Sequence, residues 1–155
     1  MRRKKTFRGQ TLVEFALIFP IMLMVTYGLI ELGRFMFVYA SVSAAAREGA
    51  RYGSAVGISE NGVPYFQDCQ GIEDAVHRVS WFVTVTNIDI QYDYGDPATT
   101  FATCPPPDSA ISTEQGTRIH VTVTAQYHPF FFFNSSFDIT ADSAHTIVRS
   151  VPVEP

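Results

Sequence analysis

Residues 15–30 read FALIFPIMLMVTYGLI, sixteen positions without a charged side chain. If the stretch is counted from Leu12 it is nineteen residues long, and Glu14 is its only charge. In a helix, nineteen residues rise about 28 Å, close to the thickness of the hydrocarbon layer of a bilayer. A cleavable secretory signal has a shorter apolar region with a small-residue cut site directly behind it, whereas the alanines at 44–46 lie far downstream. The stretch therefore predicts a membrane-spanning helix.

Charge is distributed unevenly along the chain. Five of the eleven Lys and Arg residues fall in the leader MRRKKTFR, residues 1–8. Because positive charge beside a hydrophobic segment stays in the cytoplasm, we expect the N-terminus inside and the bulk of the chain outside. Residues 10–155 carry six basic and fifteen acidic side chains, a net charge of −9. Such a chain lacks the clustered Lys and Arg that neutralise phosphates, so we expect no nucleic-acid partner.

Glu14 is unusual because it lies at the start of the apolar stretch. A charged carboxylate at the centre of a membrane helix costs about 2.5–3.5 kcal/mol on insertion scales, and such residues usually have a function. Glu14 follows Gly9 by five residues, and Gly9 itself directly follows the basic leader. The combination of a basic leader, a glycine and an early carboxylate is therefore the main functional signal in the sequence.

Several short motifs in the first third of the chain are shared with one known family. They are Gly9, Gln10, LVEF at 12–15, Pro20, Gly28, ELGR at 31–34 and AAREGARY at 45–52. Together they resemble the processing site of type IV-like prepilins and, more broadly, the TadE-like pseudopilins of the tight-adherence (Flp) pilus. The resemblance covers residues 8–53.

This resemblance implies a processing event and a set of partners. A membrane prepilin peptidase would cut between Gly9 and Gln10, so that Glu14 becomes the fifth residue of the mature chain and Phe15 the sixth. Glu14 would then face the new α-amino group of a neighbouring subunit, or another membrane partner, during assembly. The implied partners are the peptidase, sister pseudopilins or pilus subunits, the inner-membrane assembly platform and the lipid bilayer. The implied location is the bacterial cytoplasmic membrane, with a surface pilus as the destination after assembly.

The helix is expected to continue beyond the membrane, over residues 10–53. Glu31 and Arg34 are three residues apart and can pair where the helix leaves the lipid. Farther along, small residues recur at every fourth position, at Ala45, Gly49 and Gly53. Such a ladder allows close approach of another element, either a neighbouring subunit or the protein's own globular domain. Pro20 is tolerated in a membrane helix, where it either sets a bend or has no further role.

Residues 54–155 are expected to form one small extracytoplasmic domain, after a leader at 1–9 and the long helix at 10–53. Apolar residues at helical spacing predict a short helix over 71–82, for which Asp68 is one candidate cap and Gln70, directly before the first turn, is the other. Alternation predicts strands over 88–94 and 119–127, and a weaker third strand over 139–148. Residues 96–116 are rich in Pro, Thr and Ser and are expected to be irregular. The predicted class is α+β, with the short helix packed on a three-stranded antiparallel sheet.

Cys69 and Cys104 both fall in the predicted extracytoplasmic part. An even pair outside the cytoplasm favours a disulfide. The alternative, a metal site, lacks any other His or Cys at ligand spacing. We therefore expect a bond that joins the irregular segment to the start of the short helix.

Pro129 precedes four consecutive phenylalanines, Phe130, Phe131, Phe132 and Phe133. Because side chains alternate along a strand, they cannot all face one core. The favoured interpretation is a contact with the membrane surface, the long helix or a partner subunit. The alternative is a loop that folds back over the end of the sheet.

The sequence contains no recognisable catalytic motif: no phosphate-binding glycine loop, no serine elbow and no zinc-binding His pair. We therefore expect no enzyme, no cofactor and no metal site. Two functions remain open. One is a structural or assembly component, a minor pseudopilin of a pilus or related secretion machinery. The other is a permanently anchored envelope module that binds a partner through its sheet and the four phenylalanines.

Overall fold

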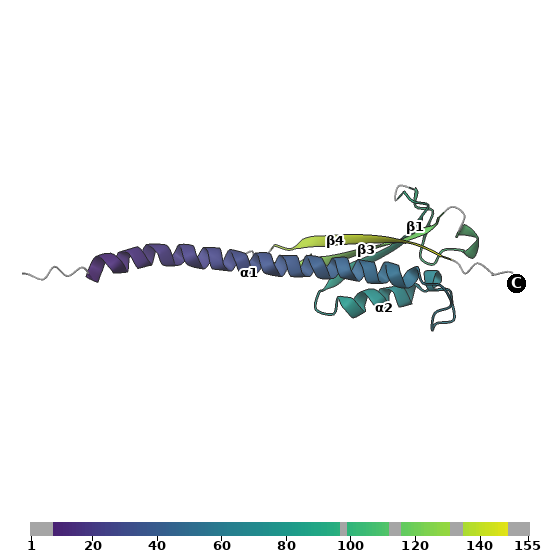
Figure 1. Cartoon of the computed structure of the whole chain (residues 1–155), viewed down its shortest axis with the longest axis horizontal. Coiled ribbons are helices and arrows are strands. Elements are labelled where there is room, and N and C mark those ends of the chain that lie inside the picture. Colours follow the sequence, from purple (N-terminus) through teal and green to yellow (C-terminus); the bar gives the residue numbers. More distant parts are fainter. Residues whose placement is uncertain (1–7, 97–98, 112–115, 131–134, 149–155) are drawn as a thin grey trace, which may run out of the picture. The chain divides into compact units, whose positions relative to one another are not determined.

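The computed structural model describes residues 8–96, 99–111, 116–130 and 135–148. The chain divides into two compact units, Met1–Met36 and Phe37–Pro155. One continuous helix, α1 (Arg8–Gly53), contains the division between them. The predicted long apolar N-terminal helix is thus confirmed (Figure 1). Most of the basic leader, residues 1–7, lies outside the described residues.

Two helical turns and a short helix follow α1 in the second unit. They are η1 (Tyr65–Gln67), α2 (Cys69–Val79) and, later in the chain, η3 (Asp108–Ala110). Of the two candidate caps of the short helix, Asp68 is confirmed, since its carboxylate accepts a hydrogen bond from the backbone N–H of Gly71 at 3.0 Å. That bond satisfies one of the N–H groups that the first turn of a helix leaves without a partner.

The sheet has four antiparallel strands, so the expectation of three is wrong. The strands are β1 (Val85–Asp93), β2 (Ala102–Thr103), β3 (Arg118–Tyr127) and β4 (Phe137–Thr146), in the spatial order β2-β1-β3-β4. The additional strand β2 lies within the segment that was expected to be irregular, where Thr103 pairs with Gln91. Two residues are too few to show alternation, and the strand exists because its backbone pairs with the edge of β1.

The core of the second unit lies between one face of the sheet and the helices. Along β3 every second side chain is buried, beginning with Ile119 and ending with Tyr127. The buried side chains of α2 include Ile72 and Val76. In Figure 1, α2 and the adjoining part of α1 run along the sheet within this unit. The alternation that predicted β3 therefore reflects burial of one face only.

The small residues of α1 pack against the protein's own domain. Ala45 and Gly49 are buried, and a Cβ atom added at Gly49 would lie 2.7 Å from a methyl group of Val76 in α2 and 3.2 Å from one of Val121 in β3. A Cβ atom at Gly53 would overlap Ile119. The small residues were predicted to pack against either a neighbouring subunit or the protein's own globular domain. These contacts are with the globular domain.

The disulfide between Cys69 and Cys104 is confirmed, with a Cα–Cα distance of 5.8 Å. It joins the first residue of α2 to the segment directly after β2. The bond therefore fixes the end of the edge strand to the helix layer.

Candidate functional site

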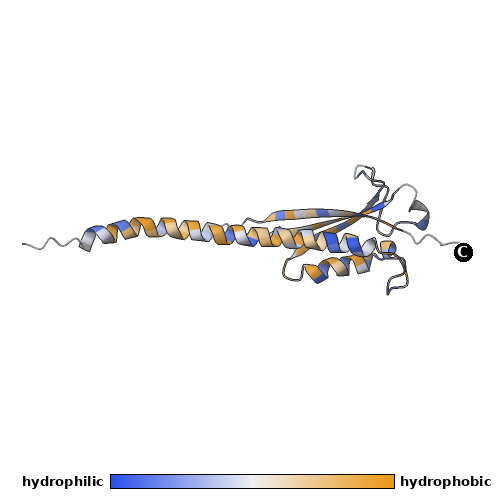
Figure 2. Ribbon diagram, in the orientation of Figure 1, coloured by the Kyte–Doolittle hydropathy of each residue, from blue (hydrophilic) through white to orange (hydrophobic). Residues whose placement is uncertain are grey.

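The N-terminal part of α1 exposes apolar side chains almost throughout. Among the residues of the first unit, Leu12, Phe15 and Met24 are 65–76% exposed. Figure 2 shows this part of α1 as mainly hydrophobic. One helix, over Gly9–Gly53, is long and apolar enough to cross a membrane, and its most apolar window is not buried by the rest of the described protein. An apolar helix surface of this length in water would be unfavourable, so α1 is a candidate membrane span.

The residues predicted for processing lie together in the first turns of α1. The side-chain amide of Gln10 donates a hydrogen bond to a carboxylate oxygen of Glu14 at 3.4 Å. Glu14 is exposed, as is Phe15, whose ring stacks on that of Phe19 with centroids 5.4 Å apart. The carboxylate of Glu14 is thus directed along the helix toward its N-terminal end, one turn from the predicted cut.

Gly9 has open space around it. No heavy atom outside its immediate helix neighbourhood would lie within 4 Å of an added Cβ atom, and its φ is not in the left-handed region. Neither packing among the described residues nor backbone conformation therefore requires glycine at position 9. A requirement for glycine there would have to come from an external partner.

Two further features of the first unit match the sequence analysis. The predicted pair between Glu31 and Arg34 is confirmed, with the two charged groups 3.1 Å apart. Pro20 lies inside α1 without ending it. The apolar stretch therefore runs from Glu14, near its N-terminal end, to this ion pair at its C-terminal end.

In the second unit, Asp68 organises the junction between α1, the following loop and α2. Its carboxylate accepts hydrogen bonds from the Asn61 amide at 2.9 Å, from the Tyr52 hydroxyl at 3.0 Å and from the backbone of Gly71. Burial acts to raise the pKa of the Asp68 carboxyl, but these hydrogen bonds outweigh it and lower the pKa below its ordinary value. Burial and the bond to Asp68 together raise the pKa of Tyr52 to about 12. The cluster is an ionised, satisfied structural centre.

A second buried carboxylate belongs to Asp93, the last residue of β1. It pairs with the guanidinium of Arg118 at 2.8 Å and accepts a bond from the backbone of Gly95. Burial acts to raise the pKa of Asp93, and the Arg118 and Gly95 contacts outweigh it, so the pKa is lowered overall. Sequence reasoning missed both carboxylate centres as buried groups, since an aspartate near a turn gives no sign of its burial.

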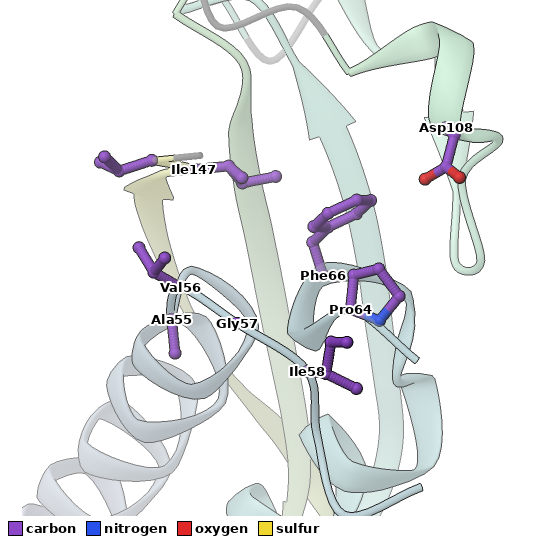
Figure 3. Close-up of a pocket in the computed structure, with 9 residues that line it drawn as sticks. Ala55, Val56, Gly57, Ile58, Pro64, Phe66, Asp108 and Ile147 are labelled. Carbon is purple, nitrogen blue, oxygen red and sulfur yellow. The ribbon is translucent and has the colours of Figure 1, made fainter. Parts of the chain in front are cut away.

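A pocket of about 430 Å³ lies at the end of the second unit where β4 stops. Figure 3 shows Ile58, Pro64, Phe66 and Ile147 around it, with the carboxylate of Asp108 to one side. The Asp108 carboxylate accepts a hydrogen bond from the side chain of Gln67 at 2.9 Å. The lining combines apolar surface with one carboxylate already engaged in a hydrogen bond, and offers no pair of groups arranged for acid–base chemistry.

Among the residues that the structure describes, no group of three or more His, Cys, Asp or Glu side chains could hold a metal ion. Of the four phenylalanines predicted to contact a partner, Phe130 is 53% exposed. Phe131, Phe132 and Phe133 lie outside the described residues.

A family model described as TadE-like protein matches residues 9–51, which confirms the resemblance seen in the sequence over that region. The matched region begins at Gly9 and covers the candidate membrane span and most of the remainder of α1. No curated protein matches the chain, and no solved structure matches it.

Proposed function

We propose that this protein is a structural or assembly component of a tight-adherence (Flp-type) pilus or a related secretion machine, in the role of a minor pseudopilin. The observation that carries the proposal is the match to the TadE-like family over residues 9–51, on a helix whose apolar surface is exposed. Position 9 adds support, because a glycine that no neighbouring atom requires suits recognition by another protein. The proposed role is not catalytic.

In this proposal the chain is inserted with its N-terminus in the cytoplasm, and a prepilin peptidase cleaves it after Gly9. Cleavage creates a positively charged α-amino group on Gln10, one helical turn from the Glu14 carboxylate. An ion pair in hydrocarbon offsets part of the free-energy cost of placing each charge there. Pairing with the α-amino group of its own chain or of a neighbouring subunit would therefore stabilise the Glu14 carboxylate. Sister pseudopilins or pilus subunits and the inner-membrane assembly platform are the proposed partners. Adhesion and secretion are the processes in which the assembly would act.

The N-terminal sequence of the protein from its native membrane tests the processing step. Gln10 is the expected first residue, and Gly9→Val should keep the leader, because a peptidase that reads glycine has no room for a branched side chain. Gly28→Val is a matched control, since Gly28 lies in the same helix with equally open surroundings and should leave cleavage unchanged. An intact leader on the parent protein would instead favour the alternative, a permanently anchored envelope binding module.

Assembly is tested on the same strains with Glu14→Gln. The amide is less costly to place in lipid than a charge, so insertion should not suffer. Cleavage after Gly9 should also persist, while recovery of the protein with sheared surface filaments or with the assembly complex should fall. Normal recovery of Glu14→Gln in that fraction would contradict an assembly role for the carboxylate.

A further inference from the structure

Five exposed aromatic residues of the second unit lie at one end of it, whereas Tyr94 follows the opposite end of β1. In the sheet, β1 begins at Val85 opposite Ala125, and β4 begins at Phe137 opposite Tyr127. The loop before β1 and the hairpin between β3 and β4 therefore lie at the same end. The aromatic end, as we call it, carries one α1 residue, two loop residues and two hairpin residues, namely Phe37, Trp81, Phe82, Phe130 and Phe137.

Three of these side chains, Phe37, Trp81 and Phe82, are in contact with one another and yet remain open to solvent. Phe37 stacks on Phe82 with ring centroids 4.8 Å apart, and Trp81 meets Phe82 edge to face at 5.1 Å. Trp81 is nevertheless 82% exposed and Phe37 59% exposed. A packed aromatic cluster with this much open surface is typical of a surface that meets another apolar phase.

Three stretches of the sequence that include residues of the aromatic end carry no formal charge. Residues 35–46, 79–88 and 119–137 contain no Asp, Glu, Lys or Arg. Two of these stretches are flanked directly by charged residues, Arg78 and Asp138, and the second unit is otherwise rich in acidic groups. Trp is enriched at the boundary of a bilayer, because its ring is apolar and its N–H can still bond to water or headgroups.

The short connection between the membrane span and the second unit determines how far from the bilayer the aromatic end can lie. Glu14 marks the inner end of the apolar stretch, which continues without a charge to residue 30 and is followed by the ion pair of Glu31 and Arg34, where the helix leaves the hydrocarbon layer. Arg34 then lies at the outer boundary. Phe37 follows it by three residues, which span at most about 11 Å even when fully extended. The headgroup layer on one side of a bilayer is about 5–7 Å thick, so Phe37 must lie in it or beside it.

We propose that the aromatic end, led by Trp81, inserts into the outer headgroup layer of the same bilayer that α1 crosses. The inference rests on α1 being a membrane span, and goes beyond the proposed function by giving the globular unit a lipid-binding surface of its own. Before assembly, this surface would hold the domain against the membrane. On extraction of the subunit into a filament, the aromatic end would have to leave the lipid.

The chain has a single tryptophan, so Trp81 fluorescence reports on this surface directly. The full chain is reconstituted in vesicles of phosphatidylcholine and phosphatidylglycerol, at several protein-to-lipid ratios. We expect lipids brominated near the headgroup to quench Trp81 more than lipids brominated near the chain ends, and aqueous iodide to quench it several-fold less than free tryptophan. A matched control, Trp81→Phe with Ile58→Trp, moves the tryptophan to the pocket end of the unit, where Ile58 is 68% exposed. That control should show iodide quenching and no lipid quenching.

Carbonate extraction of the same vesicles tests the membrane span separately. If α1 stays inserted while iodide reaches Trp81 freely and lipids do not quench it, the inference is overturned. The proposed function is then unaffected. Release of the protein by carbonate would instead contradict the span itself. A third outcome is that Trp81 is protected from iodide but not quenched by lipid, with the protection increasing at higher protein-to-lipid ratios. That result would show that a second copy covers the aromatic end, and it also overturns the inference.

Discussion

Substitution of Gly49 by alanine should destabilise the second unit, although alanine is the better helix former. Replacing glycine by alanine inside a helix stabilises the helix by about 0.5–1 kcal/mol, because the backbone loses less conformational entropy on folding. Against this, the added Cβ atom would lie 2.7 Å from Val76 and 3.2 Å from Val121, both fully buried. Both neighbours are β-branched and stiff at χ1, so neither can rotate away at low cost.

Overpacking of this kind costs about 1–3 kcal/mol, and two stiff neighbours place Gly49→Ala in the upper half of that range. The net loss is then on the order of 1–2 kcal/mol. For a unit of intermediate size this corresponds to a fall in Tm of about 3–8 °C. Gly49→Val adds two further methyl groups and should lower the Tm more.

The measurement is thermal unfolding of the full chain in detergent, followed by near-UV circular dichroism. Gly33→Ala is the matched control, because it makes the same substitution in the same helix where no atom lies within 4 Å. Its transition should not fall below that of the parent, because alanine is the better helix former and meets no neighbour there. A Tm for Gly49→Ala equal to or above that of the parent would refute the close packing of α1 against α2 and β3.

Two further predictions concern the second unit. Closing a loop between residues 35 positions apart stabilises by about 3–4 kcal/mol in the chain-entropy model, so Cys69→Ser with Cys104→Ser should lose that amount in urea unfolding, and reductant should have no further effect on this variant. The pKa of Asp68 is lowered in the folded protein, so its stabilisation is fully present above the unfolded value of about 4 and is lost as pH falls through the folded pKa. The urea midpoint of the parent should therefore fall on acidification below about pH 4. In Asp68→Asn the amide oxygen can still accept the hydrogen bond from Gly71, so the midpoint should fall by less. An equal fall in both proteins would contradict this role of Asp68.

Local chemistry in the sequence determined a large part of this protein. The apolar stretch after Glu14 predicted the long helix, because length and hydrophobicity alone decide whether a helix can cross lipid. Strict alternation predicted β3 and, less completely, β1, because burial on one face leaves a period of two. Asp68 was recognisable as a candidate cap from its place before an amphipathic helix, and the number and location of the cysteines predicted their bond.

Tertiary structure decided what depends on partners distant in the chain. The strand β2 forms through backbone pairing with β1, which two residues of sequence cannot signal. The ladder at Ala45, Gly49 and Gly53 suits any close neighbour, and only the fold shows that α2 and β3 occupy it. Likewise Phe37, Trp81 and Phe130 lie on three separate segments, and strand register together with the stacking of Phe37 on Phe82 brings these segments to one end. A sequence states the preference of each segment, whereas a surface shared by several segments exists only once long-range pairing has been formed.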